Sequence, residues 1–385
     1  MRNSNLLRYT AVATALAAIV AFTAPASAFA ANNWVAKENT DRASVLAYWT
    51  PERVLSAKPL PLPKSTAVSS NFADDAEGNY VEANGASTGA DGAPPRGKAP
   101  AGLAARLFTP EEAEIAAAKA ALEEYDAIEG NNFGTLNGHF SSSRVFPDAA
   151  TTTYPYLTVG KLFFTIPGEG NFICSGSVLR KRVILTAGHC VHSGNGSNSG
   201  FYTNFMFVPA YRSGVAPVGT WDWQYVITTS TWFSGGASFP NAADYAMIEP
   251  RDKGTSIIGN VTGFLGFQTL KLRPNHAHLL GYPANLDSGE RMHQVTSQSL
   301  RAASPNAVEY GSDMRGGSSG GPWVQNFGIV SSGQTGGLNT GSNRVIGITS
   351  YGFVSTTPLI QGSSIPDSRF TTILNTICAH KAGNC

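Results

Sequence analysis

The stretch GGSSGGPW, residues 316–323, places two adjacent serines between two pairs of glycines. A serine hydroxyl becomes an effective nucleophile only when a base accepts its proton and an acid orients that base. Glycines on both sides permit the positive φ values of a sharp turn that aims backbone N–H groups at one point. A glycine-rich surface loop would have the same composition, so the stretch has to be weighed together with the rest of the chain.

Two further segments supply the missing partners. LTAGHC at 185–190 contains a histidine, and DYAMIEP at 244–250 opens with an aspartate that precedes an apolar strand. With residues 316–323 they resemble the trypsin-like (chymotrypsin-fold) serine peptidases, whose order along the chain is also His, Asp, Ser. Lipase-type serine hydrolases run Ser, Asp, His instead. The resemblance spans roughly residues 155–378, and it implies an all-β fold of two antiparallel six-stranded β-barrels.

The resemblance assigns a role to each residue of this constellation. His189 would be the general base, Asp244 would orient it, and Ser319 would be the nucleophile. In the family, the oxyanion hole consists of the backbone N–H groups that match Gly317 and Ser319 here. The cycle would be acylation of Ser319 by a polypeptide substrate and deacylation by water.

Other readings of these residues stay open. Asp222, in TWDWQ, competes with Asp244, although no apolar strand follows it. His189 could be a structural surface histidine, or it could form a metal-binding pair with His192. No carboxylate of the metallopeptidase pattern lies between these two histidines. We therefore expect neither a metal nor an organic cofactor.

Ser318 departs from the family. Many zymogens of the family carry an aspartate at this position, which pairs with the new N-terminus after cleavage and forms the oxyanion hole. A serine cannot make that ion pair, so activation must follow another route. The tripeptide GYP at 281–283 resembles one in the glutamyl-endopeptidase-like subfamily.

A second match concerns substrate binding. GITSYG at 347–352 resembles the strand that flanks the primary specificity pocket, where Ser350, Tyr351 and Gly352 would pair with the substrate backbone by adding a strand. Glutamate-cleaving members have a histidine at the position of Thr349. Its absence weakens a preference for glutamate.

Asp313 is a candidate specificity residue. It lies six residues before Ser319, where trypsins keep the acid that selects Arg or Lys. Arg315, however, stands where the trypsin pocket has a cysteine. Asp313 would therefore either select basic side chains or form hydrogen bonds within its loop.

The four cysteines predict disulfides. An even number of cysteines in an exported chain favours bridges over thiols, although four cysteines allow three pairings. A zinc site is the alternative, but no two cysteines have the spacing of a zinc knuckle. We expect the sequential pairing, Cys174–Cys190 and Cys378–Cys385. In the family, the cysteine beside the histidine pairs with one about sixteen residues earlier, which matches Cys174.

The first thirty residues have the pattern of a secretory signal peptide. Arg2 and Arg8 precede an apolar run at 11–24, and small residues follow it. Cleavage is expected after Ala28 or Ala30, and the product is expected to be extracellular or periplasmic. An uncleaved anchor is the alternative, but the run is shorter than the ~18 residues of a membrane-spanning helix. No second run of that length occurs, so the mature form should not be in a membrane.

Residues 31–144 are interpreted as a pro-segment, mostly disordered. The alternating prolines of AKPLPLPK at 57–64 favour an extended, polyproline-like conformation. Residues 65–105 contain almost no large apolar side chains, so they are expected to be disordered. One helix is predicted near 110–129, where Thr109 can form the N-cap.

The remaining chain is predicted to form the two barrels, residues 145–255 with His189 and Asp244, and residues 256–385 with Ser319. Short β-type runs bounded by turn residues are typical of such a fold. The clearest runs are YLTVGKLFFTI, RVILTAG, FYTNFMFVPAY, HAHLLGYP and RVIGITSYG. DSRFTTILNTICAHK, at 367–381, predicts a C-terminal helix with Asp367 or Ser368 as its cap.

These features predict a secreted serine endopeptidase made as a precursor. The chain has 27 Lys and Arg against 26 Asp and Glu, so its charge gives no argument for nucleic acid or an anionic membrane as a partner. Its expected partners are polypeptide substrates and its own pro-segment. Maturation is expected near residues 140–154, with Arg144–Val145 as the candidate bond. A catalytically silent protein-binding member of the fold and an esterase are the alternatives.

Overall fold

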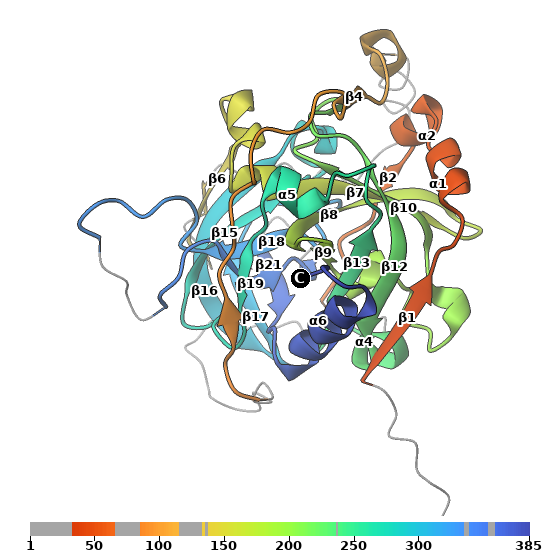
Figure 1. Cartoon of the computed structure of the whole chain (residues 1–385). Helices are drawn as coiled ribbons and strands as arrows, with labels where there is room; N and C mark the ends of the chain where they lie inside the picture. Colours follow the sequence, from red (N-terminus) through yellow and green to blue (C-terminus); the bar gives the residue numbers. More distant parts are fainter. Residues whose placement is uncertain are drawn as a thin grey trace, which may run out of the picture. The chain divides into compact units, whose positions relative to one another are not determined.

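The computed structural model describes residues 33–65, 85–114, 133–134, 138–235, 238–334, 339–352 and 359–385 (Figure 1). The predicted signal peptide lies outside these residues. Within the described ranges, no helix has the length and apolar character needed to cross a membrane.

The first barrel consists of six antiparallel strands that close on themselves. Their order is β12-β10-β7-β8-β9-β13, and β13 pairs back with β12. The strands are β7 (Val159–Ile166), β8 (Gly170–Arg180), β9 (Val183–Thr186), β10 (Thr203–Pro209), β12 (Trp221–Thr229) and β13 (Ala246–Pro250). Three of the predicted runs therefore form β7, β9 and β10.

The second barrel follows in the chain and has the order β21-β17-β16-β15-β18-β19. Its strands are β15 (His276–Gly281), β16 (His293–Ala303), β17 (Ala307–Gly311), β18 (Pro322–Gln325), β19 (Arg344–Ile348) and β21 (Ile360–Ser364). β20 (Tyr351–Gly352) follows β19 closely and pairs with β21, which closes the ring. The predicted all-β fold of two six-stranded barrels with a C-terminal helix is confirmed.

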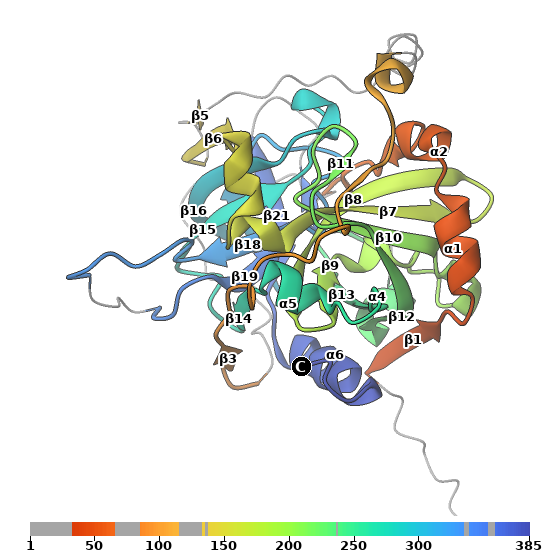
Figure 2. The ribbon, with the colours of Figure 1, turned by 45° about the horizontal axis from the view of Figure 1, so that its top comes forward.

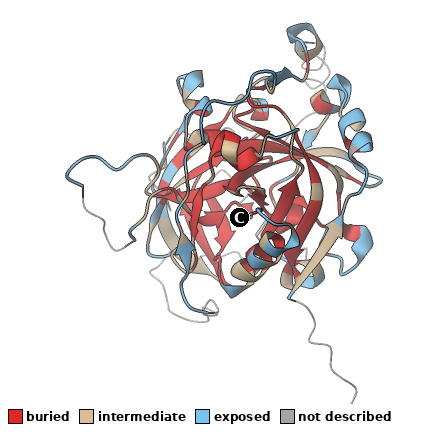
Figure 3. Ribbon diagram, viewed as in Figure 1, coloured by how far each residue is buried: buried red, intermediate tan, exposed pale blue. Residues whose placement is uncertain are grey.

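Burial explains why these runs form barrels. Along β7 and β9 nearly every side chain is buried, because one face packs into the barrel and the other contacts neighbouring elements. Figure 3 shows buried strands in both barrels and exposed helices and connections around them. A substantial apolar core is therefore available to hold the strand ends, where the candidate site residues lie.

The C-terminal helix α6 (Ser368–His380) follows the predicted pattern. Asp367 accepts a hydrogen bond from Arg369 N and is the N-cap. Four apolar side chains at helical spacing are buried: Phe370, Ile373, Leu374 and Ile377. The helix packs on β12 and β13 of the first barrel, although the chain reaches it from the second.

The predicted disorder of residues 31–144 is wrong for the described part of that segment. β1 (Trp34–Glu38) pairs with β12, and β6 (Phe140–Arg144) pairs with β16 (Figure 1). The shorter β2 (Lys58–Pro59) pairs with β8, and β3 (Gly89–Ala90) lies beside β14 (Gly266–Gln268) (Figure 2). β4 (Ala105–Arg106) pairs with β11 (Val215–Ala216), and β5 (Phe133–Gly134) pairs with β6.

The order of this segment has a physical source that composition does not reveal. Its large apolar residues are few, but Val45, Val54, Leu62 and Phe108 are each at most 7% exposed. Between these anchors the backbone pairs with sheet edges, which requires no particular side chains. Residues 66–84, within the stretch expected to be disordered, lie outside the described residues.

Short helices connect these strands. Before the barrels they are α1 (Arg42–Tyr48) and α2 (Pro51–Leu55), and in the barrels α4 (Ser230–Gly235) and α5 (Ile258–Thr262). The helix predicted at 110–129 begins where expected. Thr109 Oγ1 accepts from Glu112 N, and the Glu112 carboxylate accepts from Thr109 N, as in a capping box. Residues 115–129 of that prediction lie outside the described residues.

Candidate active site

The loop around Ser319 has the backbone that its glycines predict. Gly317 has a φ of +88° and Gly320 a φ of +78°. A Cβ atom at Gly320 would lie 2.1 Å from Thr186 Oγ1, so the loop also needs glycine there for close packing. Ser319 between them is fully buried. The loop therefore fits tightly against the end of β9.

Ser175 fastens this loop to the first barrel. Its backbone N–H donates to Ser319 O at 2.7 Å, and its hydroxyl donates to Gly317 O at 2.9 Å. The preceding residue, Cys174, forms a disulfide with Cys190, which follows His189 directly. The Ser319 loop and the His189 turn are thus tied to the same point of β8.

His189 lies in a short 3₁₀ turn, Gly188–Cys190, directly after β9. Its Nδ1 is 2.7 Å from Asp244 Oδ2, and its backbone N–H donates to Asp244 Oδ1 at 2.8 Å. The carboxylate therefore fixes both the backbone and the ring of His189. Because the buried carboxylate accepts from Nδ1–H, the ring nitrogen Nε2 is left as the proton acceptor.

Two hydroxyl groups complete the surroundings of Asp244. Ser350 Oγ donates to Asp244 Oδ2 at 2.6 Å, and Asp244 N donates to Ser364 Oγ at 3.0 Å. The contact from Ser350 was not foreseen, since the sequence assigned this residue only to substrate binding. This hydrogen bond holds the carboxylate in one orientation toward the His189 ring. Ser350 therefore acts as a positioning residue for the His189–Asp244 pair.

The competing aspartate lies elsewhere. Asp222 belongs to β12, and its carboxylate forms an ion pair with Arg251 at 3.1 Å. The hydrogen bond to the His189 ring thus belongs to Asp244. His192 does not form a metal pair with His189 either: its Nδ1 accepts from Gly194 N, and its Nε2–H donates to Ser197 O.

Two reactive atoms at the site are unsatisfied. Within the described chain, neither His189 Nε2 nor Ser319 Oγ has a hydrogen-bond partner, and both atoms are buried. A buried polar atom without a hydrogen-bond partner costs stability, so its presence calls for an explanation. A base with its acceptor nitrogen free and an uncommitted hydroxyl are what nucleophilic catalysis requires, and catalytic contacts often tighten only when substrate binds.

The four cysteines form the predicted bridges, Cys174–Cys190 and Cys378–Cys385. This confirms the sequential pairing. The sulfurs of Cys174 and Cys190 and a ring nitrogen of His189 lie within 4.8 Å of one another. Thiolates are the form of cysteine that binds zinc, and these two sulfurs are bonded to each other instead.

Ser318 is held by uncharged partners. Its hydroxyl donates to Arg315 O at 2.7 Å and accepts from Gln361 Nε2 at 2.9 Å. The Gln361 side chain also donates to Met314 O and accepts from Ser312 Oγ. A neutral network thus takes the place of the aspartate-based ion pair, and the loop is ordered without a new N-terminus.

The candidate specificity residues turn largely into the protein. Asp313 is 2% exposed, and burial raises the pKa of its carboxyl, although a hydrogen bond from Ser142 in β6 opposes this shift. Burial lowers the pKa of the neighbouring Arg315. Thr349 Oγ1 accepts from Trp323 Nε1, and Tyr351 OH donates to Glu309 Oε1. The side chains of residues 349–351 are therefore engaged within the protein, as are both backbone groups of Thr349 and the N–H of Ser350.

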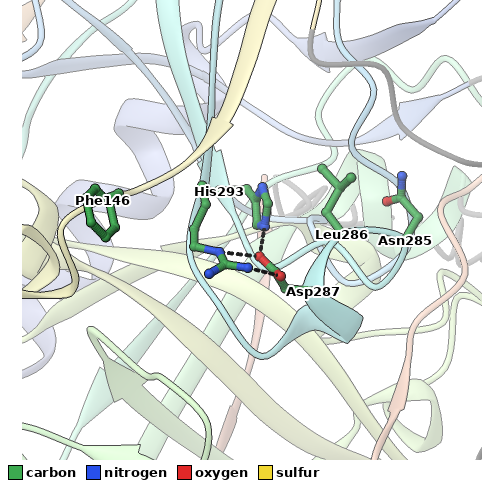
Figure 4. A pocket seen from close by; sticks show the side chains of 6 residues that line it. Phe146, Asn285, Leu286, Asp287 and His293 are labelled. Carbon is green, nitrogen blue, oxygen red and sulfur yellow. Dashed lines mark hydrogen bonds and ion pairs between the residues drawn. The ribbon is translucent and has the colours of Figure 1, made fainter.

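A surface pocket of ≈ 520 Å³ lies at the end of β6, and one of its lining residues, Asn285, donates a hydrogen bond to Asp313 O (Figure 4). The Asp287 carboxylate connects two sides of the pocket, because it accepts hydrogen bonds from both Arg144 and His293 Nε2. Phe146 on its rim is 80% exposed. The pocket thus adjoins the bond proposed for maturation and contains none of the candidate catalytic residues.

Comparison with known proteins places this fold. No family model matches the chain. It is 24% identical over 183 residues to an extracellular metalloprotease of Bacillus subtilis (strain 168), a match that covers 46% of this chain and 55% of that protein. The chain thus matches about half the length of that curated relative.

Solved structures give a fuller match. The chain is similar to the thermostable serine protease AL20 from an extremophilic microorganism, with a TM-score of 0.50, 26% identity, and coverage of 61% of this chain and 100% of that one. Protease Anisep from Arthrobacter nicotinovorans has a TM-score of 0.48 and 28% identity, covering 58% of this chain and 96% of its own.

The two closed barrels and the similarity to AL20 identify the structural class, which is that of the chymotrypsin-fold, trypsin-like serine peptidases.

Proposed function

We propose that this chain is a secreted serine endopeptidase. The observation that carries the proposal is the bidentate contact of Asp244 with the ring and backbone of His189. Beside it lies the loop with positive φ at Gly317 and Gly320, in which Ser319 Oγ has no hydrogen-bond partner among the described residues. The similarity to AL20, which is a serine protease, supports the same conclusion.

The geometry supports the following reaction. His189 Nε2 takes the proton of Ser319 Oγ as the oxygen attacks a peptide carbonyl, and the carbonyl oxygen becomes an oxyanion. The oxyanion accepts hydrogen bonds from the N–H groups of Gly317 and Ser319. When the C–N bond breaks, His189 gives its proton to the leaving amine and an acyl-enzyme remains. Water then gives a proton to His189 as it attacks the ester carbonyl. When the C–Oγ bond breaks, His189 returns this proton to Ser319 Oγ and the acid is released.

Fluorophosphonate labelling of the processed protein tests this proposal. Wild type should be labelled and should hydrolyse denatured casein, whereas Ser319→Ala should do neither. Ser318→Ala is the matched control, because it removes the neighbouring hydroxyl and should keep labelling. A chelator should leave the activity unchanged, since no metal takes part in the reaction.

Other outcomes favour the competing functions. Casein hydrolysis that a chelator abolishes, without Ser319 labelling, would favour the chemistry that the name of the Bacillus relative states. Cleavage of small esters without any protein hydrolysis would indicate an esterase. Absence of both labelling and hydrolysis would indicate a binding protein with this fold.

Secretion and maturation belong to the same proposal. The first thirty residues direct export, and the pro-segment, residues 31–144, is removed by a cut at 140–154, with Arg144–Val145 as the candidate bond. Arg144 is largely accessible there, whereas Val145 is buried and donates its N–H to Met292 O. N-terminal sequencing of the secreted form tests this proposal, and a start within residues 31–100 contradicts it.

A further inference from the structure

A short piece of the pro-segment lies directly on the candidate site. This piece, residues 58–65, is called the strap below, and it contains the alternating prolines. It begins as β2, which runs parallel to β8 and pairs Lys58 with Phe172 and Pro59 with Ile173. Leu60 N then donates to Ile173 O at 3.0 Å.

The middle of the strap reaches the predicted oxyanion hole. Gly317 N, one of the two expected oxyanion donors, gives its hydrogen bond to Leu60 O at 3.1 Å. The peptide groups of Leu60 thus connect β8 of the first barrel with the loop of the nucleophile. A Cβ atom at Gly316 would lie 3.0 Å from the same carbonyl oxygen. The strap carbonyl therefore occupies a donor that a substrate carbonyl would need.

The far end of the strap occupies the predicted substrate-binding strand. Gly352 N donates to Pro63 O at 3.0 Å, and Gly352 O accepts from Ser65 N at 3.4 Å, in a parallel bridge centred on Lys64. Leu62 is 7% exposed, and a Cβ atom at Gly352 would lie 2.4 Å from its Cδ2. The strap adds itself to this edge as a peptide ligand does.

The direction of the strap decides its role. By the resemblance, Ser350–Gly352 flank the specificity pocket, which holds the side chain of the residue with the scissile carbonyl. The resemblance further implies that residues preceding this carbonyl lie along the same strand, and that the leaving amine lies on the side of His189. In the strap, the residues at Gly352 follow Leu60 in the chain. The nitrogen after the Leu60 carbonyl, that of Pro61, therefore points toward Gly352.

We propose that the strap is a built-in inhibitor that binds the active-site cleft in the direction opposite to a substrate. The inference rests on the proposed function and adds a partner and a means of regulation to that site. A carbonyl in the oxyanion hole does not lead to hydrolysis here, because His189 cannot protonate a nitrogen on the opposite side. The strap thus blocks the cleft without being consumed.

The prolines suit this role. Pro59, Pro61 and Pro63 fix φ near the extended conformation, so the strap loses little conformational entropy when it binds. The intervening Leu60 keeps the N–H that bonds to Ile173. The tether to the rest of the chain gives the strap a high effective concentration at the cleft.

The test compares full-length chains that keep the strap. Leu62→Asp places a charge at a buried contact with Gly352 and should release the strap. Leu46→Asp is the matched control, because Leu46 also lies in the pro-segment and is 46% exposed. Fluorophosphonate labelling of Ser319 should be at least about tenfold faster in Leu62→Asp than in wild type, whereas Leu46→Asp should match wild type. Hydrogen exchange should show that the amides of Gly317 and Gly352 lose protection only in Leu62→Asp.

The outcomes separate this inference from the proposed function. Equal and fast labelling of wild type and Leu62→Asp would overturn the inhibitory strap and leave the peptidase intact. Absence of labelling in Leu62→Asp, although exchange shows the strap released, would overturn the proposed peptidase instead.

A second variant tests the direction. Pro61→Ala turns the bond after Leu60 into an ordinary peptide bond. If the strap binds in the direction opposite to a substrate, mass spectrometry should find the bond after Leu60 intact. Cleavage of this bond would show that the strap binds in the direction of a substrate.

Discussion

Replacement of Asp244 by asparagine should remove most activity while preserving the fold. Asp244 accepts three hydrogen bonds through its carboxylate, from the backbone N–H of His189, from His189 Nδ1 and from Ser350 Oγ. An asparagine retains one oxygen and presents an NH₂ group in place of the other. The backbone N–H cannot become an acceptor, but the imidazole can change tautomer. We therefore expect the amide oxygen to face the backbone and the NH₂ group to face Nδ1.

That arrangement sets the size of the effect. A ring that accepts at Nδ1 carries its proton on Nε2, so it cannot take the proton of Ser319. A wrong tautomer of this kind lowers kcat about 10⁴-fold, which corresponds to about 5.4 kcal/mol at 1.36 kcal/mol per tenfold. Ser350→Ala removes a single hydrogen bond to Asp244 and should cost far less, about tenfold.

The measurement is kcat for casein-derived fluorogenic peptides, with thermal unfolding to confirm the fold. Asp222→Asn is the matched control, because Asp222 is also buried but pairs with Arg251. The kcat of Asp222→Asn should stay within a few fold of the wild-type value, even if the substitution lowers the melting temperature. Near-normal activity in Asp244→Asn, with loss of activity in Asp222→Asn, would refute the reasoning.

Two further predictions concern the surroundings of the site. Gly320→Ala should abolish fluorophosphonate labelling and lower the melting temperature. The new methyl group would lie 2.1 Å from the buried Thr186 Oγ1, and alanine rarely adopts the positive φ of this position. Unchanged labelling would contradict the tight fit of the loop. Burial lowers the pKa of His192, so the unfolded chain binds more protons near pH 6, and the free energy of unfolding should fall as pH drops below about 6.5. His192→Asn keeps an acceptor for Gly194 N–H but has no side chain that gains a proton in this range. Its free energy of unfolding should therefore fall less than that of wild type between pH 7 and pH 5. Equal losses in urea titrations of the two proteins would show that His192 does not contribute to the pH dependence.

The barrels and the loop around Ser319 were predictable because their signals are local. Gly317 and Gly320 have positive φ, a conformation that residues other than glycine rarely adopt, so the glycines themselves indicate the turn. Asp367 directly precedes the apolar pattern of α6, so its role as the N-cap is also visible in the local sequence. The order of the described part of residues 31–144 was not predictable, since β1 and β3 pair through backbone groups that any composition supplies. The contact of Ser350 with Asp244 joins positions 106 residues apart, and nothing local to either residue indicates it.

The pro-segment strands have a consequence for the timing of activation. β1 pairs with five residues of β12, and β6 pairs with five residues of β16, so the segment contributes a strand to each barrel sheet. Cutting the chain after β6 would break one covalent bond and leave these ladders in place. The cut segment would then be a separate subunit whose release depends on dilution and on digestion. Dilution after export would therefore favour release of the segment, whereas a high concentration of the cut chain would favour its rebinding.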